Sequence, residues 1–380
     1  MSQSILSFLV ILFNAFLNCN FVPNQWKAAL VVPVFKKGDR SKPNNYRPIS
    51  LTSCFSRLFE LILYKKILEY FLTNNLFSSN QFGFLPNKST CSQLLSCYYD
   101  WCRNFSEKIS TQVVYTDIQK AFDSVSHSKL MLILKSYGIN IFVLNWIKNF
   151  LSNRSQQVIV GSQLSSPCKI ASGVPQGSII GPLLFLIFIN PINSCSTPLG
   201  SSGSLTLFAD DAKVYGTDPN KLQSSLDELS IWLKNHQLTL ATHKCAVLHI
   251  YKPLSSPSLY LNNSAISSVD NMKDLGIVIS QDLKWASHVD HVYKNARKSS
   301  FFIIKFAKTK NIWTLLLLYK IYVRSKLEYS TPLWSPSFDK DIVKIEKVQR
   351  DFTRIAFKKC GIPYTSYEDR LYKVNLKSFQ

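Results

Sequence analysis

The order of apolar and polar residues along the chain separates strands from helices. A valine-rich run in WKAALVVPVFKKGDRSKPNNYRPISL (residues 26–51) breaks at KKGD, which predicts a hairpin with cations at its turn and on its return strand. Residues 111–125 begin as a strand, residues 205–215 (LTLFADDAKVY) predict a second hairpin, and further strands are expected near 245–250 and 275–280. Helical spacing predicts helices within residues 53–77, 91–105, 127–138, 179–192 and 222–237, and in most of the chain from Trp285 onward.

The first 23 residues, MSQSILSFLVILFNAFLNCNFVP, form the most apolar end of the chain. No positive residue precedes Lys27, which argues against a secretory signal peptide. The apolar stretches at 179–192 and 315–318 fall short of the roughly 20 residues that a membrane span needs. We therefore expect no signal peptide and no transmembrane span, and we predict an N-terminal amphipathic helix that packs through Leu6, Val10, Phe13 and Leu17.

Composition indicates a folded protein with an anionic partner. With 380 residues, 46% of them hydrophobic, the chain can bury a large core, and two or three subdomains are expected. Its 44 Lys and Arg against 23 Asp and Glu give a formal net charge of +21, and residues 281–380 alone hold 20 basic and 9 acidic side chains. Such an excess favours nucleic acid. A basic protein that is merely soluble, or one that touches anionic membranes, remains the alternative.

Nine cysteines, at positions 19, 54, 91, 97, 102, 168, 195, 245 and 360, form no C-x-x-C motif and no regular framework. They predict reduced, mostly buried thiols in an intracellular protein. The pairs Cys97/Cys102 and His288/His291 each lack a second ligand pair, which disfavours a structural zinc site.

Three aspartates carry the candidate chemistry. Asp210 and Asp211 are adjacent in the predicted hairpin of residues 205–215, and Asp117 comes where the strand of residues 111–125 runs out. Carboxylates a few Å apart raise one another's pKa, so nearby cations must keep them ionised. Two divalent ions supply that charge, and hard oxygen ligands select Mg²⁺ or Mn²⁺. The set predicts a two-metal centre for phosphoryl transfer, with Asp117 and Asp210 as bridging ligands and Asp211 more peripheral.

Eight segments, in order across roughly residues 20–360, resemble the reverse transcriptase domain of a non-LTR (LINE-type) retrotransposon. They are the 26–51 segment, QFGFLPNKST, YTDIQKAFDSVSH, SGVPQGSIIGP, LFADDAKVY, LTLATHKCAVL, KDLGIVI and YKIYVRSKLEYSTPLW. The resemblance implies an α+β fold of the right-hand polymerase type, with fingers, a palm built on an antiparallel sheet and a helical thumb. The expected division is 1–110 (N-terminal helix and fingers), 111–280 (palm, with fingers elements around 130–170) and 281–380 (basic helical thumb, apparently truncated).

The resemblance also implies roles for the aspartates and two further residues. Asp117, Asp210 and Asp211 become the metal-binding triad. Phe122 becomes the bulky side chain that excludes a ribose 2′-hydroxyl and so selects dNTPs, for which ordinary core packing is the alternative. Lys244 lies where relatives have a lysine thought to protonate the leaving pyrophosphate, although it could equally be a solvated lysine at the start of a strand.

Four more residues are implied to contact the incoming nucleotide. Lys36 and Arg47 match the fingers residues that touch the triphosphate. A solvated basic loop is the alternative, and Lys37 could replace Lys36. Gln176 and Gly177 match the loop that packs against the nascent base pair, which could also be a helix start rich in helix breakers. The chain departs from the family at Ala241, where relatives usually have Asn.

The implied function is an RNA-directed DNA polymerase that extends a DNA primer on an RNA template with dNTPs and two Mg²⁺ or Mn²⁺ ions. We expect it in an intracellular ribonucleoprotein, nuclear or cytoplasmic, without a membrane partner and without the endonuclease domain of its relatives in this chain. Two alternatives stay open: a polymerase-derived nucleic-acid-binding module without turnover, and a remnant that does not fold stably.

Overall fold

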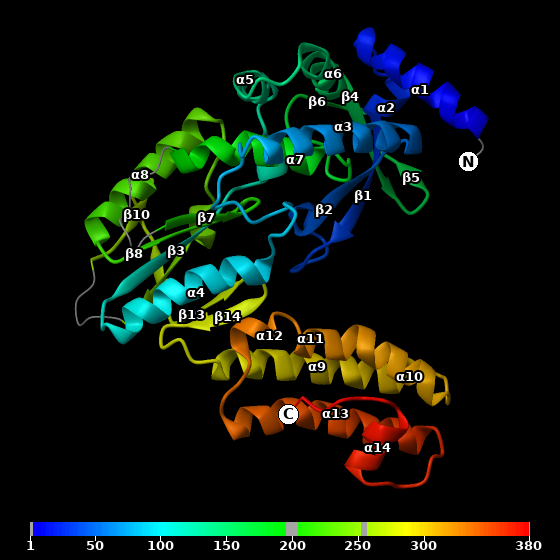
Figure 1. Cartoon of the computed structure of the whole chain (residues 1–380), viewed down its shortest axis with the longest axis vertical. Helices are drawn as coiled ribbons and strands as arrows, with labels where there is room; N and C mark the ends of the chain where they lie inside the picture. Colours follow the sequence, from blue (N-terminus) through cyan, green and yellow to red (C-terminus); the bar gives the residue numbers. More distant parts are fainter. Residues whose placement is uncertain (1–2, 195–203, 252–256, 380) are drawn as a thin grey trace. The chain divides into compact units, whose positions relative to one another are not determined.

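Short strands alternate with helices through the first half of the chain (Figure 1), which we describe from a computed structural model covering residues 3–194, 204–251 and 257–379. The elements up to residue 194 are helices α1 (Gln3–Asn18), α2 (Asn24–Lys27), α3 (Cys54–Thr73), α4 (Thr90–Ser106), α5 (His127–Ser136), α6 (Ile141–Leu151) and α7 (Gly181–Ile189), and strands β1 (Ala28–Phe35), β2 (Tyr46–Leu51), β3 (Thr111–Asp117), β4 (Arg154–Val160), β5 (Gln163–Leu164) and β6 (Cys168–Ile170).

The chain then changes from strands to helices. The strands are β7 (Ser204–Phe208), β8 (Asp211–Gly216), β9 (Ala246–Ile250), β10 (Tyr260–Leu261), β11 (Ser264–Ala265), β12 (Ser267–Val269), β13 (Asn271–Asp274) and β14 (Ile277–Ser280). The helices are α8 (Pro219–Asn235), α9 (Ala286–Phe306), α10 (Ile312–Tyr319), α11 (Ser325–Leu327), α12 (Thr331–Trp334), α13 (Asp339–Lys359) and α14 (Tyr367–Lys373). The helical tail predicted from Trp285 onward is confirmed.

Two larger sheets hold the regions of predicted chemistry. The first has the order β2-β1-β4-β5, with β6 also paired to β4. Its β1–β2 hairpin is antiparallel and places Val34 opposite Arg47, as the sequence predicts. The second has the order β12-β9-β3-β8-β7, and the antiparallel hairpin β7–β8 brings Phe208 opposite Asp211.

Internal packing divides the chain into two units. The first comprises the described residues of Met1–Ser89, Val114–Ala246 and Pro257–Ser267, and the second those of Thr90–Val113, Val247–Ser256 and Ser268–Gln380. Every residue predicted for the catalytic site lies in the first unit. The predicted boundaries at residues 110 and 280 stay a prediction.

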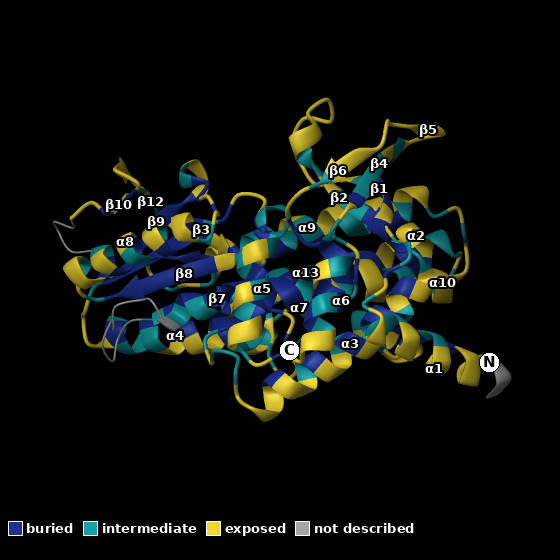
Figure 2. Cartoon of the chain, turned by 90° about the horizontal axis from the view of Figure 1, so that it is seen from above, coloured by how far each residue is buried: buried dark blue, intermediate teal, exposed yellow. Residues whose placement is uncertain are grey.

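The core of the first unit explains two apolar runs of the sequence. Strand β8 is buried along its length after Asp211, and Figure 2 shows it in dark blue. Helix α7 is buried from Leu183 through Ile189. Because all of its faces meet protein, its sequence GPLLFLIFI can be apolar on every side.

A buried carboxylate fixes the start of α7. Glu60 on α3 accepts hydrogen bonds from the backbone N–H groups of Ile179 (2.8 Å) and Ile180 (3.3 Å) through Oε2. Burial raises the pKa of Glu60, and the positive charge of buried Arg154 opposes that rise. The loop that leads into α7 is therefore anchored at its end by a side chain of α3.

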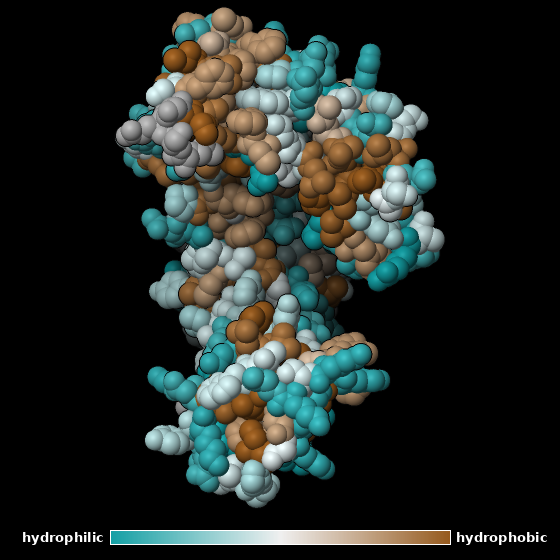
Figure 3. All heavy atoms as spheres, turned by 90° about the vertical axis from the view of Figure 1, so that its right-hand side faces the viewer, coloured by the Kyte–Doolittle hydropathy of each residue, from teal (hydrophilic) through white to brown (hydrophobic). Residues whose placement is uncertain are grey.

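Helix α1 forms as predicted, but only part of its predicted packing face is correct. Phe13 is buried as predicted, together with Leu9, and Leu17 is half-buried, whereas Leu6 and Val10 are exposed and the prediction is wrong for these two. The helix is apolar on nearly all sides, and periodicity therefore could not select one face. Exposed apolar side chains, among them Phe8 of α1 and Val160 of β4, are a general feature of the surface, and Figure 3 shows such side chains gathered in patches on one face.

The prediction of mostly buried cysteines is also wrong. Of the eight described cysteines, none of which is in a disulfide, only Cys97 and Cys245 are buried, while Cys19, Cys54 and Cys168 are exposed. Cys195 lies outside the described residues. A cysteine is buried only where apolar segments pack around it, and composition alone does not show where such packing occurs. Within the described ranges no helix is both long and apolar enough to cross a membrane.

Candidate active site

The two adjacent aspartates lie at a backbone turn held from a distant segment. Ala209, just before them, has a left-handed backbone with φ of +56°, and its N–H donates to Gln81 Oε1 at 3.0 Å. The same oxygen accepts from the N–H of Gly83 at 2.8 Å, and Phe82 N donates to Leu207 O at 2.8 Å. Buried Gln81 therefore fixes the backbone of Ala209, the residue that precedes Asp210.

The sequence interpretation missed Gln81, although a glutamine two residues before the Gly of QFGF was the available signal. A buried amide has both a donor and an acceptor to satisfy, and a nearby glycine, which allows close backbone approach, lets such an amide bond to a neighbouring main chain. Nothing in the residues around Gln81 indicated that its partner would be the backbone of Ala209.

Gly83 is required for the close approach of these two segments. A Cβ added at Gly83 would lie 2.4 Å from the backbone nitrogen of Ala209, and backbone cannot move aside as a side chain can. If Asp210 is catalytic, as the resemblance implies, Gly83→Ala should displace the Asp210 turn and lower the rate of nucleotide incorporation by about 10²-fold. Single-turnover incorporation at saturating substrate measures this loss.

Gly161→Ala is the matched control, because a Cβ there meets nothing within 4 Å. With an alanine there, the φ of +62° costs about 1–2 kcal/mol of stability, but the Asp210 turn stays in place. Equal rates for the Gly83 variant and the wild-type chain would show that the turn tolerates displacement.

The charge of Asp117 acts on the carboxyl group of Asp210. Asp117 ends β3, and β8 is the neighbouring strand. Burial raises the pKa of Asp210, and the negative charge of Asp117 raises it further, whereas Lys36 and Arg47 lower it. Three of the predicted residues, one carboxylate and two cations, thus act on the Asp210 carboxylate.

Asp211, the residue after Asp210, begins β8 and is exposed. Within the part of the chain that the structure describes, no three His, Cys, Asp or Glu side chains converge into a ready metal site. The donor set itself fits a hard divalent cation, since Asp117 and Asp210 offer carboxylate oxygens whose mutual repulsion such an ion relieves. The three-carboxylate set stays a prediction.

Lys244 lies on Asp117. Its Nζ is 2.6 Å from Asp117 Oδ2, and the loop that carries it is bonded to β3 by the Ala241 N–H, which donates to the Asp117 carbonyl at 2.8 Å. Ala241 is buried. Its backbone makes this contact although the sequence has Ala where relatives usually have Asn. The ammonium group is in the site, while its role as a proton donor stays a prediction.

The loop around Gln176 is joined to β2, the strand that carries Arg47. Ser50 N donates to the Gln176 carbonyl at 2.7 Å, and Gly177, with φ of +116°, leaves only 2.4 Å between a hypothetical Cβ and Ser50 O. The Gln176 side chain donates from Nε2 to Asp123 Oδ1 at 2.9 Å. Asp123, which the sequence interpretation did not select, orients the predicted substrate-facing amide.

Phe122 is held between two aromatic rings. It stacks on Phe185 of α7 with ring centroids 4.4 Å apart and meets Phe84 edge-on at 6.4 Å. The side chain is half-buried, so one part packs and another part is free to meet a ligand. Both interpretations of Phe122, packing and steric selection, are compatible with this position.

A cavity of about 310 Å³ opens beside this loop. Lys120, Asp123, Lys169 and Gln176 are among the residues that line it. Its charged lining residues are Lys120, Arg154 and Lys169, which are basic, and Asp123, which is acidic. The Gln176 side chain therefore lies beside a cavity that is more basic than acidic.

A family model described as reverse transcriptase (RNA-dependent DNA polymerase) matches residues 34–314. The probable RNA-directed DNA polymerase from transposon X-element of Drosophila melanogaster is 25% identical over 364 residues, which cover 93% of this chain and 40% of the relative. The probable RNA-directed DNA polymerase from transposon BS of the same organism is 27% identical over 347 residues, which cover 86% of this chain and 37% of the relative. The chain thus spans well under half the length of these relatives.

Solved structures agree in fold. Telomerase from Candida albicans, in complex with a TWJ fragment of telomeric RNA, aligns with 96% of this chain and 68% of its own at a TM-score of 0.52 and 11% identity. Apo telomerase from Candida tropicalis gives the same TM-score over 95% of this chain and 68% of its own. The predicted right-hand polymerase fold and the resemblance to non-LTR retrotransposon enzymes are confirmed, and the chain belongs to the reverse transcriptase (RNA-dependent DNA polymerase) family.

Proposed function

We propose that this chain is an RNA-directed DNA polymerase that extends a DNA primer on an RNA template. The observation that carries the proposal is the interaction of Asp117, at the end of β3, with Asp210, in the turn that leads into the neighbouring strand β8, where Lys36 and Arg47 are close enough to act on the Asp210 carboxylate. A carboxylate that another carboxylate and two cations influence belongs to a site suited to both divalent metal and triphosphate.

Asp117 and Asp210 would hold two Mg²⁺ or Mn²⁺ ions, with Asp211 as a peripheral ligand. When bound, the ions supply activation of the primer 3′-hydroxyl and charge stabilisation of the departing pyrophosphate. Before they bind, Lys244 neutralises Asp117 through its 2.6 Å contact. In this proposal Lys244 then leaves the carboxylate and donates a proton to the pyrophosphate.

The remaining residues select and position the nucleotide. Arg47 and Lys36 bind the triphosphate oxygens. Gln176, oriented by Asp123 at 2.9 Å, and Gly177 pack against the nascent base pair. Phe122 excludes the 2′-hydroxyl of a ribonucleotide. The expected partners are therefore an RNA template, a DNA primer and dNTPs, in a nuclear or cytoplasmic ribonucleoprotein.

A second candidate function is nucleic-acid binding without turnover. The observation in its favour is the same ion pair, because the Lys244 ammonium competes with a metal for Asp117 Oδ2. Primer extension on an RNA template with Mg²⁺ and dNTPs separates the two. Extension by the wild-type chain supports the polymerase, whereas tight primer–template binding with no incorporated nucleotide supports the binding module.

A further inference from the structure

The loop that precedes α7 is docked along the segment that carries Phe122. Val174 N donates to the Phe122 carbonyl at 2.8 Å, and Gly173 N donates to the Val125 carbonyl at 2.8 Å. Gly173 has φ of +87°, and a Cβ there would lie 2.6 Å from Asp123 O, so the two backbones approach more closely than a side chain would allow. The loop and the segment are therefore held in one fixed arrangement.

Asp123 joins the same two segments through hydrogen bonds of its own. Its Oδ1 accepts from Gln176 Nε2 at 2.9 Å, and its backbone carbonyl accepts from Ser172 Oγ at 3.0 Å. Asp123 and Gln176 are both half-buried, and both line the cavity of about 310 Å³. Among the residues that line this cavity, all of which the structure describes, Asp123 supplies the only carboxylate.

The Asp123 carboxylate fixes which end of the Gln176 amide faces it. A carboxylate accepts hydrogen bonds, whereas an amide has one donor end and one acceptor end. The reverse orientation would bring the amide oxygen against a carboxylate oxygen, and neither atom could donate. The amide nitrogen is therefore held toward Asp123, and the amide oxygen Oε1 is turned away from it.

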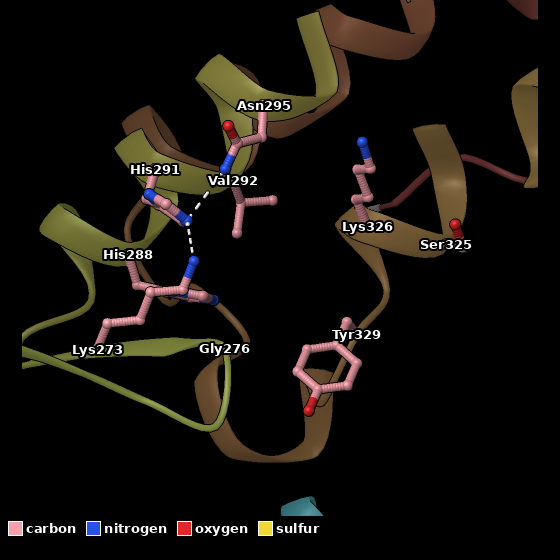
Figure 4. Close-up of a pocket in the computed structure, with 9 residues that line it drawn as sticks. All are labelled: Lys273, Gly276, His288, His291, Val292, Asn295, Ser325, Lys326 and Tyr329. Atoms are coloured by element: carbon pink, nitrogen blue, oxygen red, sulfur yellow. Dashed lines mark hydrogen bonds between the residues drawn. The ribbon is translucent and has the colours of Figure 1, made fainter. Parts of the chain in front are cut away.

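An amide in the second unit shows what a different partner does. Figure 4 shows Asn295 in a cavity of about 320 Å³, where its Nδ2 donates to His291 Nε2 at 3.0 Å. An imidazole nitrogen accepts or donates according to its tautomer and charge, so such an amide can turn when the ring changes state. The carboxylate of Asp123 gives the Gln176 amide a more definite orientation.

The Oε1 atom of Gln176 remains available to a ligand. Within the described residues, the bond to Asp123 is the one hydrogen bond of this side chain, and Oε1 is not among the buried polar atoms that lack a partner. The backbone of Gln176 is fixed as well, since its carbonyl accepts from Ser50 N of β2 at 2.7 Å. A fixed and accessible acceptor favours a ligand that offers a hydrogen-bond donor.

We propose that Asp123 is a specificity-determining positioning residue, which holds Gln176 with Oε1 toward the nascent base pair so that the site selects a hydrogen-bond donor there. The inference rests on the proposed function, in which Gln176 packs against that pair. An incoming dGTP offers two such donors, the 2-amino group of the base and the 3′-hydroxyl of the sugar. Loss of one hydrogen bond between neutral groups should lower affinity by about 10-fold.

The test measures nucleotide binding to the full chain on an RNA template whose DNA primer ends in a dideoxynucleotide, so that no chemistry follows. Isothermal titration calorimetry with Mg²⁺ gives the affinities for three nucleotides opposite a template cytosine. These are dGTP, dITP, which lacks the 2-amino group, and 2′,3′-dideoxyGTP, which lacks the 3′-hydroxyl. The wild-type chain should prefer dGTP over one analogue, which identifies the donor, and Asp123→Ala should reduce that preference by about 10-fold.

The change in preference between chains is the quantity compared, because the weaker base pair of dITP is common to all of them. Asp123→Asn should keep the wild-type preference, since its Oδ1 can still accept from Gln176 Nε2. The matched control is Asp227→Ala, which removes the same kind of bond, from Gln223 Nε2 at 2.8 Å on α8, and should also keep it. An unchanged preference in Asp123→Ala, an equal loss in the Asp227 variant, or an asparagine variant that behaves as the alanine variant overturns the inference.

A double variant tests whether Asp123 acts through Gln176. Gln176→Ala should lose the same preference, and adding Asp123→Ala to it should cause no further loss. A further loss in the double variant would mean that Asp123 acts through another contact, and would overturn its positioning role. Circular dichroism of each variant checks that the fold is intact.

Extension of an ordinary primer separates this inference from the proposed function. If no chain extends the primer but Asp123→Ala still loses the preference in binding, the polymerase proposal fails and the role of Asp123 stands. If the wild-type chain extends the primer but neither analogue binds differently in the Asp123→Ala chain, the polymerase proposal stands and the role of Asp123 is refuted.

Discussion

Asp210→Asn is expected to abolish nucleotide incorporation while making the protein more stable. Without metal, burial and the Asp117 charge both disfavour the Asp210 carboxylate, so a neutral side chain of the same shape removes a destabilising interaction. The free energy of unfolding should rise by about 1 kcal/mol. Incorporation should fall by about 10³-fold, at least the loss that follows removal of one preorganised electrostatic group.

Chemical denaturation and single-nucleotide incorporation measure the two effects on the same preparation. Asp227→Asn is the control, because Asp227 is exposed on α8 and accepts a bond from Gln223 Nε2 at 2.8 Å that asparagine can also accept. A stabilised Asp210 variant that still incorporates nucleotide would separate this carboxylate from catalysis.

Phe122→Val is expected to admit ribonucleotides. If the ring excludes the 2′-hydroxyl, the smaller side chain should raise the ratio of rNTP to dNTP incorporation by about 10²-fold. If the ring serves packing alone, the variant loses about 1–3 kcal/mol of stability and keeps its selectivity. Competition between a dNTP and its matching rNTP on one template measures the ratio.

Phe188→Val separates selectivity from a general loss of packing. Phe188 is buried on the same helix as Phe185, the stacking partner of Phe122, but meets His236 instead. Its replacement should cost comparable or greater stability and leave the nucleotide ratio unchanged. A similar change in ratio for both variants would favour packing as the cause.

Local patterns of the sequence were sufficient for the strands and turns that carry the aspartates. The apolar run interrupted by Asp210 and Asp211 can form a hairpin from its own residues, and the valines of β3 end at Asp117 in the same way. The order of the motifs, through the family resemblance, then suggested that the segments carrying Asp117, Asp210 and the cations Lys36 and Arg47 come together. The predicted hairpins rest on residues close in the chain, and the predicted site rests on the family resemblance.

Contacts between distant segments were out of reach of such patterns. Gln81 and Ala209 are 128 residues apart, and Lys244 and Asp117 are 127 apart. Glu60 gave no signal, because an acidic residue in a helix is ordinarily solvated and only the fold places it under the start of α7. The packing face of α1 was equally hidden, since its apolar residues surround the helix.

The most direct test of the account is incorporation of one correct dNTP by the wild-type chain onto a DNA primer annealed to RNA, with and without Mg²⁺. We predict a primer longer by one nucleotide only when Mg²⁺ is present, and no extended product from the Asp210→Asn chain at the same protein concentration. Extension that is equal in the two chains, or its absence in a wild-type chain that binds the primer–template tightly, would contradict the assignment of Asp117 and Asp210 as the catalytic carboxylates of a polymerase.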